Sequence, residues 1–325
     1  MDGRCRVAIL SDIHYASAAE QARGEDYEFR DLSNPLVRSL LRIHRRFFWL
    51  RYPLRQNYLL DRFLAETGSA DLVIANGDYS CNTGFVGLSD DAAFESAAEC
   101  LGKLRAKFGA KLYAIIGDHE LGKFSFVGKR GGMRLKAWKR ATEQLGLQPF
   151  WKLEVGNYLL VGVTSTLIAL PAFGGETLPG EYEAWENLRE EHLVSIRRTF
   201  AELRSGQRVL LFCHDPTALP FLWREDVVRT RLPQIEQAII GHLHSPLILW
   251  KSRRLAGIPE IGFLGHSGRK FSKALREARH WQAFHVRLCP SLAGIELLKD
   301  GGYLWAEIDP AGEGTSIERR HLCRK

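Results

Sequence analysis

"IIGDHEL", residues 115–121, places a glycine, two carboxylates and a histidine directly after the apolar residues of the run 112–116. An apolar run of this length is typical of a buried strand. In open α/β sheets, ligands bind just outside the carboxyl ends of the strands. The stretch therefore predicts a strand of an α/β sheet that ends at a functional site.

The same arrangement recurs along the chain and predicts the fold class. Short runs rich in Val, Ile and Leu occupy residues 7–10, 72–75, 159–163, 209–212 and 238–240. Helical patterns lie between them at residues 90–108, 133–145 and 183–203, so strands and helices alternate as in a layered α/β fold. After residue 245 the pattern changes, and short strands are predicted at residues 247–250, 281–288 and 295–298.

Ionisable residues follow the predicted strands at residues 7–10, 72–75, 112–116, 209–212 and 238–240. They are Asp12, His14, Asp78, Asp118, His119, His214, His242 and His244. Taken singly, each has a structural explanation, such as a helix cap for Asp12 or Asp78 or a hydrogen-bonded core histidine for His214. Because strand ends in an α/β sheet meet at one edge, we expect these side chains to form a single cluster.

Imidazole and carboxylate groups without thiolates suit divalent transition metals such as Mn, Zn or Fe. One aspartate can bridge two such ions, and paired ions are well suited to the hydrolysis of phosphate esters. The cluster therefore predicts a site for two metal ions.

The set of motifs resembles the calcineurin-like metallophosphoesterases. The matching segments are Asp12-Ile13-His14, Gly77-Asp78, Gly117-Asp118-His119-Glu120, His214 and Gly241-His242-Leu243-His244. The resemblance implies a four-layer αββα sandwich with a two-metal site at one end. It also implies that Asp12, His14 and His244 hold the first metal, that Asp118, His214 and His242 hold the second, and that Asp78 bridges them. His119 would act at the leaving group as a catalytic residue, with Glu120 orienting it.

Asp118 departs from the family pattern, which usually has Asn at this position. An ionised Asp keeps an oxygen for the metal and loses the amide donor that would face the substrate phosphate. It also adds a negative charge, which should tighten binding of the second metal and repel a phosphate oxygen.

Length and composition predict one domain over residues 1–325, and the resemblance implies that it is a metallophosphoesterase domain. Residues 17–60 are expected to form an insertion or lid, and residues 246–325 to complete the second sheet. The chain has 325 residues, of which 45% are hydrophobic, and its six cysteines lack CxxC spacing, as expected for reduced thiols. The opening residues contain no apolar segment long enough for a signal peptide, which predicts a cytoplasmic location. The net charge of +7 favours anionic partners.

Residues 32–60 contain six arginines and no Asp or Glu, and they predict a basic amphipathic helix that begins at Asn34-Pro35 and stops by Pro53. One explanation is a helix that packs its apolar side on the sandwich and leaves its arginines in water. Phe48, Trp49 and Tyr52 widen the apolar surface, which favours a lid or an anionic membrane contact through residues 34–55. Arginines interleaved with aromatic residues also suit a nucleic-acid groove.

Together these features predict a dimetal phosphoester or pyrophosphate hydrolase. Its substrate would be a phosphorylated small molecule or a lipid-linked or nucleotide-linked compound of the UDP-2,3-diacylglucosamine type, cleaved at the membrane surface by a protein that is peripheral on the inner face. The alternatives are a nuclease, a cyclic nucleotide phosphodiesterase, or a binding scaffold with a non-catalytic metal site. Every ligand position still holds a competent ligand, which favours the enzyme.

Overall fold

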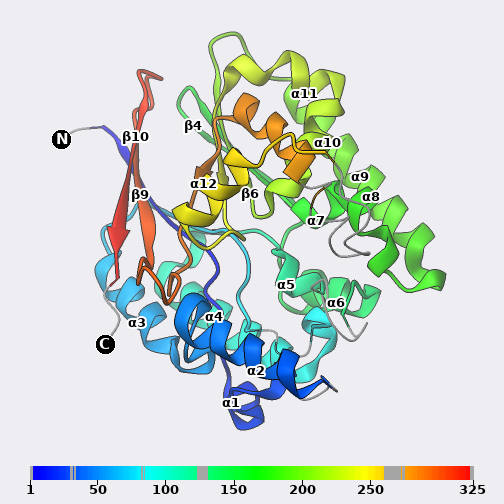
Figure 1. The fold of residues 1–325 in the computed structure, drawn as a ribbon. Helices are drawn as coiled ribbons and strands as arrows, with labels where there is room; N and C mark the ends of the chain where they lie inside the picture. Colours follow the sequence, from blue (N-terminus) through cyan, green and yellow to red (C-terminus); the bar gives the residue numbers. More distant parts are fainter. Residues whose placement is uncertain are drawn as a thin grey trace.

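Two five-stranded mixed sheets form the centre of the molecule (Figure 1). The computed structural model describes residues 3–29, 32, 34–81, 83, 85–122, 131–259, 272 and 275–322. One sheet has the order β10-β9-β1-β2-β3 and the other the order β4-β5-β6-β7-β8. The strands are β1 (Cys5–Leu10), β2 (Leu72–Ala75), β3 (Leu112–Ala114), β4 (Phe150–Val155), β5 (Tyr158–Val163), β6 (Arg208–Cys213), β7 (Ile235–Ile240), β8 (Arg287–Leu288), β9 (Gly302–Ile308) and β10 (Thr315–His321).

Alternate residues of the strands face two different layers. In β1, Val7 and Ile9 join a buried core between the sheets, whereas Ala8 and Leu10 join a second core under helices. Side chains alternate across a strand, so a strand that is covered on both faces is apolar throughout. This explains why the central strands read as continuous apolar runs in the sequence.

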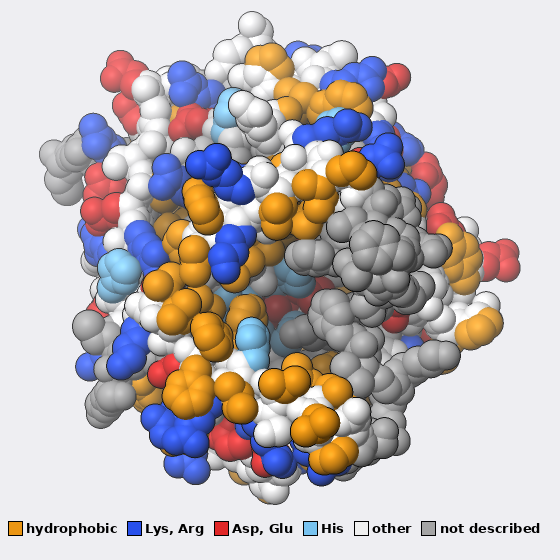
Figure 2. Space-filling model, in the orientation of Figure 1, with side chains coloured by type: hydrophobic (Ala, Val, Ile, Leu, Met, Phe, Trp, Pro, Cys, Tyr) orange, Lys and Arg blue, Asp and Glu red, His pale blue; other side chains and the backbone are white. Residues whose placement is uncertain are grey.

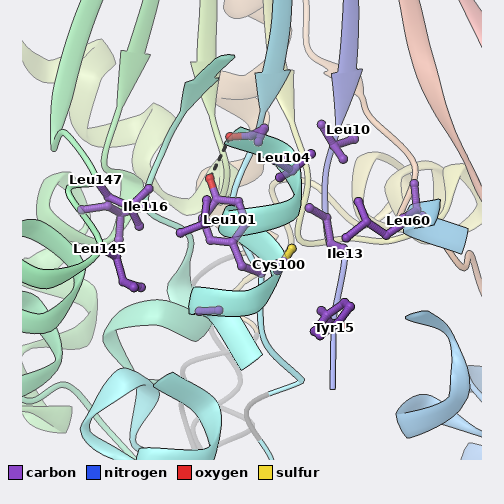
Figure 3. Packing of buried hydrophobic residues seen from close by; sticks show 14 of the residues in the cluster. Leu10, Ile13, Tyr15, Leu60, Cys100, Leu101, Leu104, Ile116, Leu145 and Leu147 are labelled. Atoms are coloured by element: carbon purple, nitrogen blue, oxygen red, sulfur yellow. Dashed lines mark hydrogen bonds between the residues drawn. The ribbon is translucent and has the colours of Figure 1, made fainter. Parts of the chain in front are cut away.

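Helices cover the outer face of each sheet. Those described are α1 (Ala18–Arg23), α2 (Pro35–His44), α3 (Asn57–Glu66), α4 (Asp91–Phe108), α5 (Asp118–Leu121), α6 (Leu135–Lys139), α7 (Ser165–Ile168), α8 (Leu170–Phe173), α9 (Tyr182–Ala201), α10 (Leu219–Arg224), α11 (Asp226–Thr230) and α12 (Pro246–Arg254). Helices α3 and α4 pack on the β1 sheet, and Figure 3 shows Leu101 and Leu104 of α4 near Leu10 and Ile116. Helices α9 and α10 pack on the β6 sheet. The predicted four-layer αββα sandwich is confirmed.

The long helices begin and end close to the predicted positions. Asp90 caps α4 by accepting a hydrogen bond from the backbone N–H of Ala93 at 3.0 Å. Asn34 caps α2 by accepting from the N–H of Leu36 at 2.9 Å, and Pro35 occupies the first turn. Helix α2 continues into a π-helical turn, η2 (Arg45–Trp49). The basic amphipathic helix is therefore present, and its status as an insertion stays a prediction.

Two of the strands predicted after residue 245 are wrong. Residues 247–250 lie in α12, because Ser245 caps the helix through the N–H of Leu247 and Pro246 starts it. Residues 295–298 form a turn, which Asp300 closes by accepting from the N–H of Ile295 at 2.9 Å. Of residues 281–288, only β8 is a strand, and a 3₁₀ helix spans Ala278–Phe284.

The strands that follow residue 246 are divided between both sheets. Strand β8 pairs with β7, whereas β9 pairs antiparallel with β1 and β10 pairs with β9. The sequence pattern predicted neither β9 nor β10, nor strand β4. The C-terminal residues therefore extend the first sheet as well as the second, and the single-domain organisation over residues 1–325 stays a prediction.

Candidate metal centre

The predicted ligands lie just after the parallel strands of both sheets. Loops after β1 and β2 carry Asp12, His14 and Asp78, and Asp118 begins the short helix α5 after β3. Loops after β6 and β7 carry His214, His242 and His244. The two sets touch directly, because the carboxylate of Asp12 accepts a hydrogen bond from the backbone N–H of His242 at 3.1 Å. All seven residues are thereby brought to one end of the sandwich.

Five of these seven residues have a left-handed backbone conformation. Their φ angles are between 50° and 59°, at Asp12, His14, Asp78, His242 and His244. A non-glycine residue in this region costs about 1 kcal/mol or more, and such strain persists mainly where the surrounding structure enforces it at a functional site. The loops are therefore shaped to direct their side chains inward.

Glycines in the same motifs allow the loops to approach closely. A Cβ atom on Gly77 would lie 2.7 Å from the Cα of Gly117, and one on Gly241 would lie 2.6 Å from Oδ2 of Asp12. A Cβ atom on Gly117 would collide with the carboxylate of Asp78. The glycine before each of these ligand motifs is thus required by close contact with neighbouring backbone or with the side chains of the cluster.

The first group of ligand atoms comes from Asp12, His14 and His244, which all lie within 4.8 Å of one another. Nε2 of His14 is 3.4 Å from Nε2 of His244, and that nitrogen is 3.3 Å from Oδ1 of Asp12. Nδ1 of His14 lies 3.3 Å from the carbonyl oxygen of Ser80, which sets the ring so that Nε2 points into the group.

The second group comes from Asp118, His214 and His242, again within 4.8 Å. Oδ1 of Asp118 is 3.1 Å from Nε2 of His214 and 3.0 Å from Nδ1 of His242. Nδ1 of His214 donates to the carbonyl oxygen of Asn76 at 2.5 Å, so Nε2 presents its lone pair to the group.

Asp78 lies beside both groups. Its Oδ2 is 3.1 Å from Nε2 of His214. Its carboxylate also lies within 4.8 Å of a ligand atom of Asp12 and of a ligand atom of His14. The side chain is 1% exposed. This is the position that a bridging ligand requires.

The residues present fit a pair of divalent cations. Bonds of about 2.1 Å in a tetrahedral site place neighbouring ligand atoms about 3.4 Å apart, which is close to the separations of 3.0–3.4 Å within the two groups. Imidazole nitrogen and carboxylate oxygen are donors that Mn, Zn and Fe accept.

The charges in the cluster also favour cations. Burial alone would lower the pKa of His214, but Asp78 and Asp12 raise that pKa well above its usual value. Burial opposes protonation of His242 as well, and Asp118 nevertheless raises its pKa to about 10. Burial raises the pKa of Asp78, and the charge of Asp118 adds to this rise. The buried carboxylates therefore hold positive charge close to themselves, whether as protons or as metal ions.

His119 and Glu120 have different surroundings. The backbone N–H of His119 donates to Oδ1 of Asp78 at 3.0 Å, and its ring lies 4.7 Å from the ring of His14. The carboxylate of Glu120 accepts from the backbone N–H groups of Gly117, Asp78 and Tyr79 at 2.8–3.0 Å. These contacts tie together the loops after β2 and β3.

Two features of the site were not predicted. The carbonyls of Asn76 and Ser80 that orient His214 and His14 leave no signal in a sequence, because every residue has a carbonyl group. Trp49, at the end of η2, has its ring 4.6 Å from that of His244. Its carbonyl accepts from the N–H of Glu296 at 2.6 Å, which holds it in this place. The sequence indicated that Phe48 and Trp49 belong to an apolar surface, but it did not predict the contact of Trp49 with the candidate ligand His244.

Comparison with known proteins agrees with this geometry. The family model for calcineurin-like phosphoesterases matches residues 5–246. The structure is similar to that of a dimetal phosphatase from Danio rerio, with a TM-score of 0.51, 14% sequence identity, and coverage of 98% of this chain and 96% of that one. A phosphopantetheinyl hydrolase from Mycobacterium tuberculosis is 15% identical over 76% of this chain and 85% of its own, with a TM-score of 0.37, which is too low to compare folds.

A search of curated protein sequences found no significant match. The family model covers about three quarters of the chain, including all of the strand-end motifs. The chain therefore belongs to the calcineurin-like phosphoesterase family and is a metal-binding phosphohydrolase.

Proposed function

We propose that this protein holds two divalent transition-metal ions, of Mn, Zn or Fe, and hydrolyses a phosphate ester or pyrophosphate bond. Asp12, His14 and His244 would hold the first ion, Asp118, His214 and His242 the second, and Asp78 both. The observation that supports this proposal is the pair of three-residue groups with Asp78 beside each. Such ions, when bound, supply Lewis acidity toward phosphoryl oxygens and neutralise the charge that develops there.

His119 would provide a proton, or positive charge, to the leaving oxygen. It is 5% exposed and neighbours both Asp78 and His14, so it borders the two metal groups. Imidazole is the side chain best suited to proton transfer near neutral pH.

Glu120 would act as a positioning residue. Burial and the charge of Asp78 raise its pKa to about 8, while three backbone N–H groups favour the ionised form. Through those N–H groups it fixes the loops that carry Asp78 and His119, and it would orient His119 through the backbone.

The substrate would combine a phosphorylated head with an apolar tail. Trp49 extends an apolar wall outward from the ligand His244, and its neighbour Phe48 is half exposed. A lipid-linked or nucleotide-linked pyrophosphate of the UDP-2,3-diacylglucosamine type, taken from a membrane surface, has both parts.

The test is a metal and substrate screen of purified, metal-stripped protein. Mn, Zn or Fe should restore cleavage of a chromogenic phosphodiester and, at a higher kcat/KM, of a nucleotide-linked lipid pyrophosphate. Asp78→Asn should remove most of this activity and weaken binding at both sites, because the lost charge faces two cations. Elemental analysis that finds at most one specifically bound metal at saturation would rule out the two-metal proposal.

Single-stranded nucleic acid belongs in the same screen as a competing substrate. Cleavage of nucleic acid in preference to every other substrate would replace the lipid-linked proposal with a nuclease. Two bound metals without cleavage of any substrate would instead favour a binding scaffold.

A further inference from the structure

Helix α2 presents its charged side, and not its apolar side, to the rest of the protein. Arg42 and Arg45 form ion pairs with Asp26 at 2.9 and 3.1 Å, and Arg45 also donates to the carbonyl oxygen of Glu25. Arg38 donates to the carbonyl oxygen of Leu32 at 2.5 Å. The explanation in which the apolar side packs on the sandwich is therefore wrong, because these polar contacts orient the helix the other way.

The apolar side of α2 and η2 is consequently open to solvent. Leu36, Leu40, Ile43 and Phe47 are 74%, 65%, 49% and 57% exposed, respectively. Their spacing places them along one stripe of the helix. An exposed apolar stripe of this length is unusual for a protein surface that contacts only water.

This stripe lies on the face onto which the metal centre opens. Trp49, at the end of η2, contacts the ring of His244, and the N–H of Leu297 donates to the carbonyl of Phe48 at 3.4 Å. Leu297 is 51% exposed. Figure 2 shows apolar side chains gathered on this face beside a hollow in which histidine and acidic side chains are visible.

The positive charges around the stripe favour an anionic bilayer over a second copy of the chain as the partner that covers it. Residues 34–55 contain no Asp or Glu, and the exposed residues Arg46 and Arg51 lie over the rings of Phe47 and Tyr52 at 5.6 and 5.0 Å. A second copy of the chain, docked on the same face, would bring arginines against arginines. A bilayer with anionic lipids offers both an apolar interior and negative headgroups.

We propose that the docking face, formed by Leu36, Leu40, Ile43, Phe47 and Leu297, binds the surface of an anionic phospholipid bilayer. The apolar side chains enter the interface between headgroups and acyl chains, and the arginines contact the headgroups. Among the described residues, no helix has the length and hydropathy to cross a bilayer. The bilayer would be the partner of the proposed hydrolase, so the role of this binding rests on the proposed function. Binding itself does not require catalysis.

The experiment is sedimentation of the full chain with vesicles of one part phosphatidylglycerol and two parts phosphatidylcholine. The double variant Leu40→Ser/Phe47→Ser is compared with the control Leu178→Ser/Val194→Ser, which removes two apolar side chains that are 41% and 52% exposed elsewhere. We expect wild type and control to bind alike and the Leu40→Ser/Phe47→Ser variant to bind at least about tenfold more weakly. Binding should also weaken at high salt and with pure phosphatidylcholine, because the arginines are then screened or unpartnered.

Hydrolysis of a small soluble phosphodiester is measured in parallel, and it should be equal in all three proteins. Wild type that stays in solution with anionic vesicles at low salt would overturn the proposal, and so would equal binding by both double variants. A vesicle-free dimer that the Leu40→Ser/Phe47→Ser variant abolishes would assign the face to self-association instead. Vesicle binding without any hydrolysis would refute the proposed function and leave the docking face standing.

Discussion

The Nε2 atom of His119 lies 3.7 Å from Oδ2 of Asp78, and the same two residues form a candidate metal-binding group with His14. The geometry thus allows two roles for His119, as a proton donor or as a ligand. An experiment can distinguish the two roles. Loss of a metal ligand would release metal, whereas loss of a proton donor would leave the metal bound.

We predict that His119→Ala lowers turnover about 10²–10⁴-fold and leaves the metal content unchanged, as for loss of a general acid. Turnover and elemental analysis of the same preparation check this. Metal lost in proportion to activity would make His119 a ligand.

Asp118 is the position where the chain departs from the family pattern. Burial alone would raise its pKa, but the charge of His242 and the hydrogen bonds from His214 and His242 hold that pKa well below its usual range, so the side chain is an anion. A carboxylate at this place can accept hydrogen bonds and bind a cation, but it cannot donate to a phosphate oxygen.

Asp118→Asn should keep the fold, loosen the second metal, and raise turnover on a small phosphodiester, because it restores a donor and removes a repulsive charge. Metal titration and steady-state kinetics measure the two effects. Equal affinity and equal turnover in both proteins would show that the replacement is neutral.

His192 is a buried histidine outside the site, and it makes stability depend on pH. Its Nε2 accepts from the N–H of Thr164 at 3.1 Å, and burial lowers its pKa to about 3. The unfolded chain takes up a proton at this residue near pH 6.5, whereas the folded protein does not. Stability from this group is therefore complete above pH 6.5 and falls as the pH is lowered toward 3.

Between pH 7 and pH 5, protonation of His192 in the unfolded chain alone lowers the free energy of unfolding by about 2 kcal/mol. In His192→Gln the fall in unfolding free energy over that interval should be smaller by about this amount, as measured by urea denaturation. His321→Gln, at an exposed histidine, is the control and should behave as wild type. An unchanged pH dependence in His192→Gln would contradict the assignment.

At the scale of elements, the loops at the strand ends depend on Glu120. Its carboxylate satisfies three buried backbone N–H groups from two loops. Glu120→Gln puts an amide N–H against at least one of these donors. A buried donor left without an acceptor costs about 1–3 kcal/mol.

We therefore expect Glu120→Gln to lower the free energy of unfolding by about 2 kcal/mol or more and to weaken metal binding. Denaturation with and without metal tests both effects. Glu183→Gln, on the exposed side of α9, is the matched control. A variant as stable as wild type would mean that the loops hold their shape without this carboxylate.

The elements also show what a sequence pattern can predict. The clustering of the candidate ligands was predictable because each follows an apolar run that forms a parallel strand, and parallel strands of an α/β sheet end at one edge. Strands β9 and β10 were not, because β9 is held by pairing with β1, about 300 residues earlier in the chain. Residues 247–250 are apolar enough for a strand, but the local signal of Ser245 and Pro246 prevails. The orientation of α2 depends on ion pairs with Asp26, which periodicity cannot reveal.

At the scale of the whole molecule, the site joins the two sheets. Asp12, His14, Asp78 and Asp118 follow strands of one sheet, and His214, His242 and His244 follow strands of the other. Each of the two groups contains ligands from both sheets. A cation bound to either group therefore requires the sheets to be packed together, and its binding energy becomes part of the stability of the sandwich.

We predict that metal stabilises both sheets together and not one loop alone. At free metal of 100–1,000 times the Kd, linkage gives about 3 to 4 kcal/mol, so chelation should lower the unfolding temperature in a single transition. Hydrogen exchange should slow at the ends of β1 and β2 and at the ends of β6 and β7 when metal is added. His119→Ala should keep this response and Asp78→Asn should lose most of it, since Asp78 is proposed to hold metal and His119 is not. Protection confined to one sheet would show that the ligands of the other sheet do not bind, and the two-metal arrangement would then be wrong.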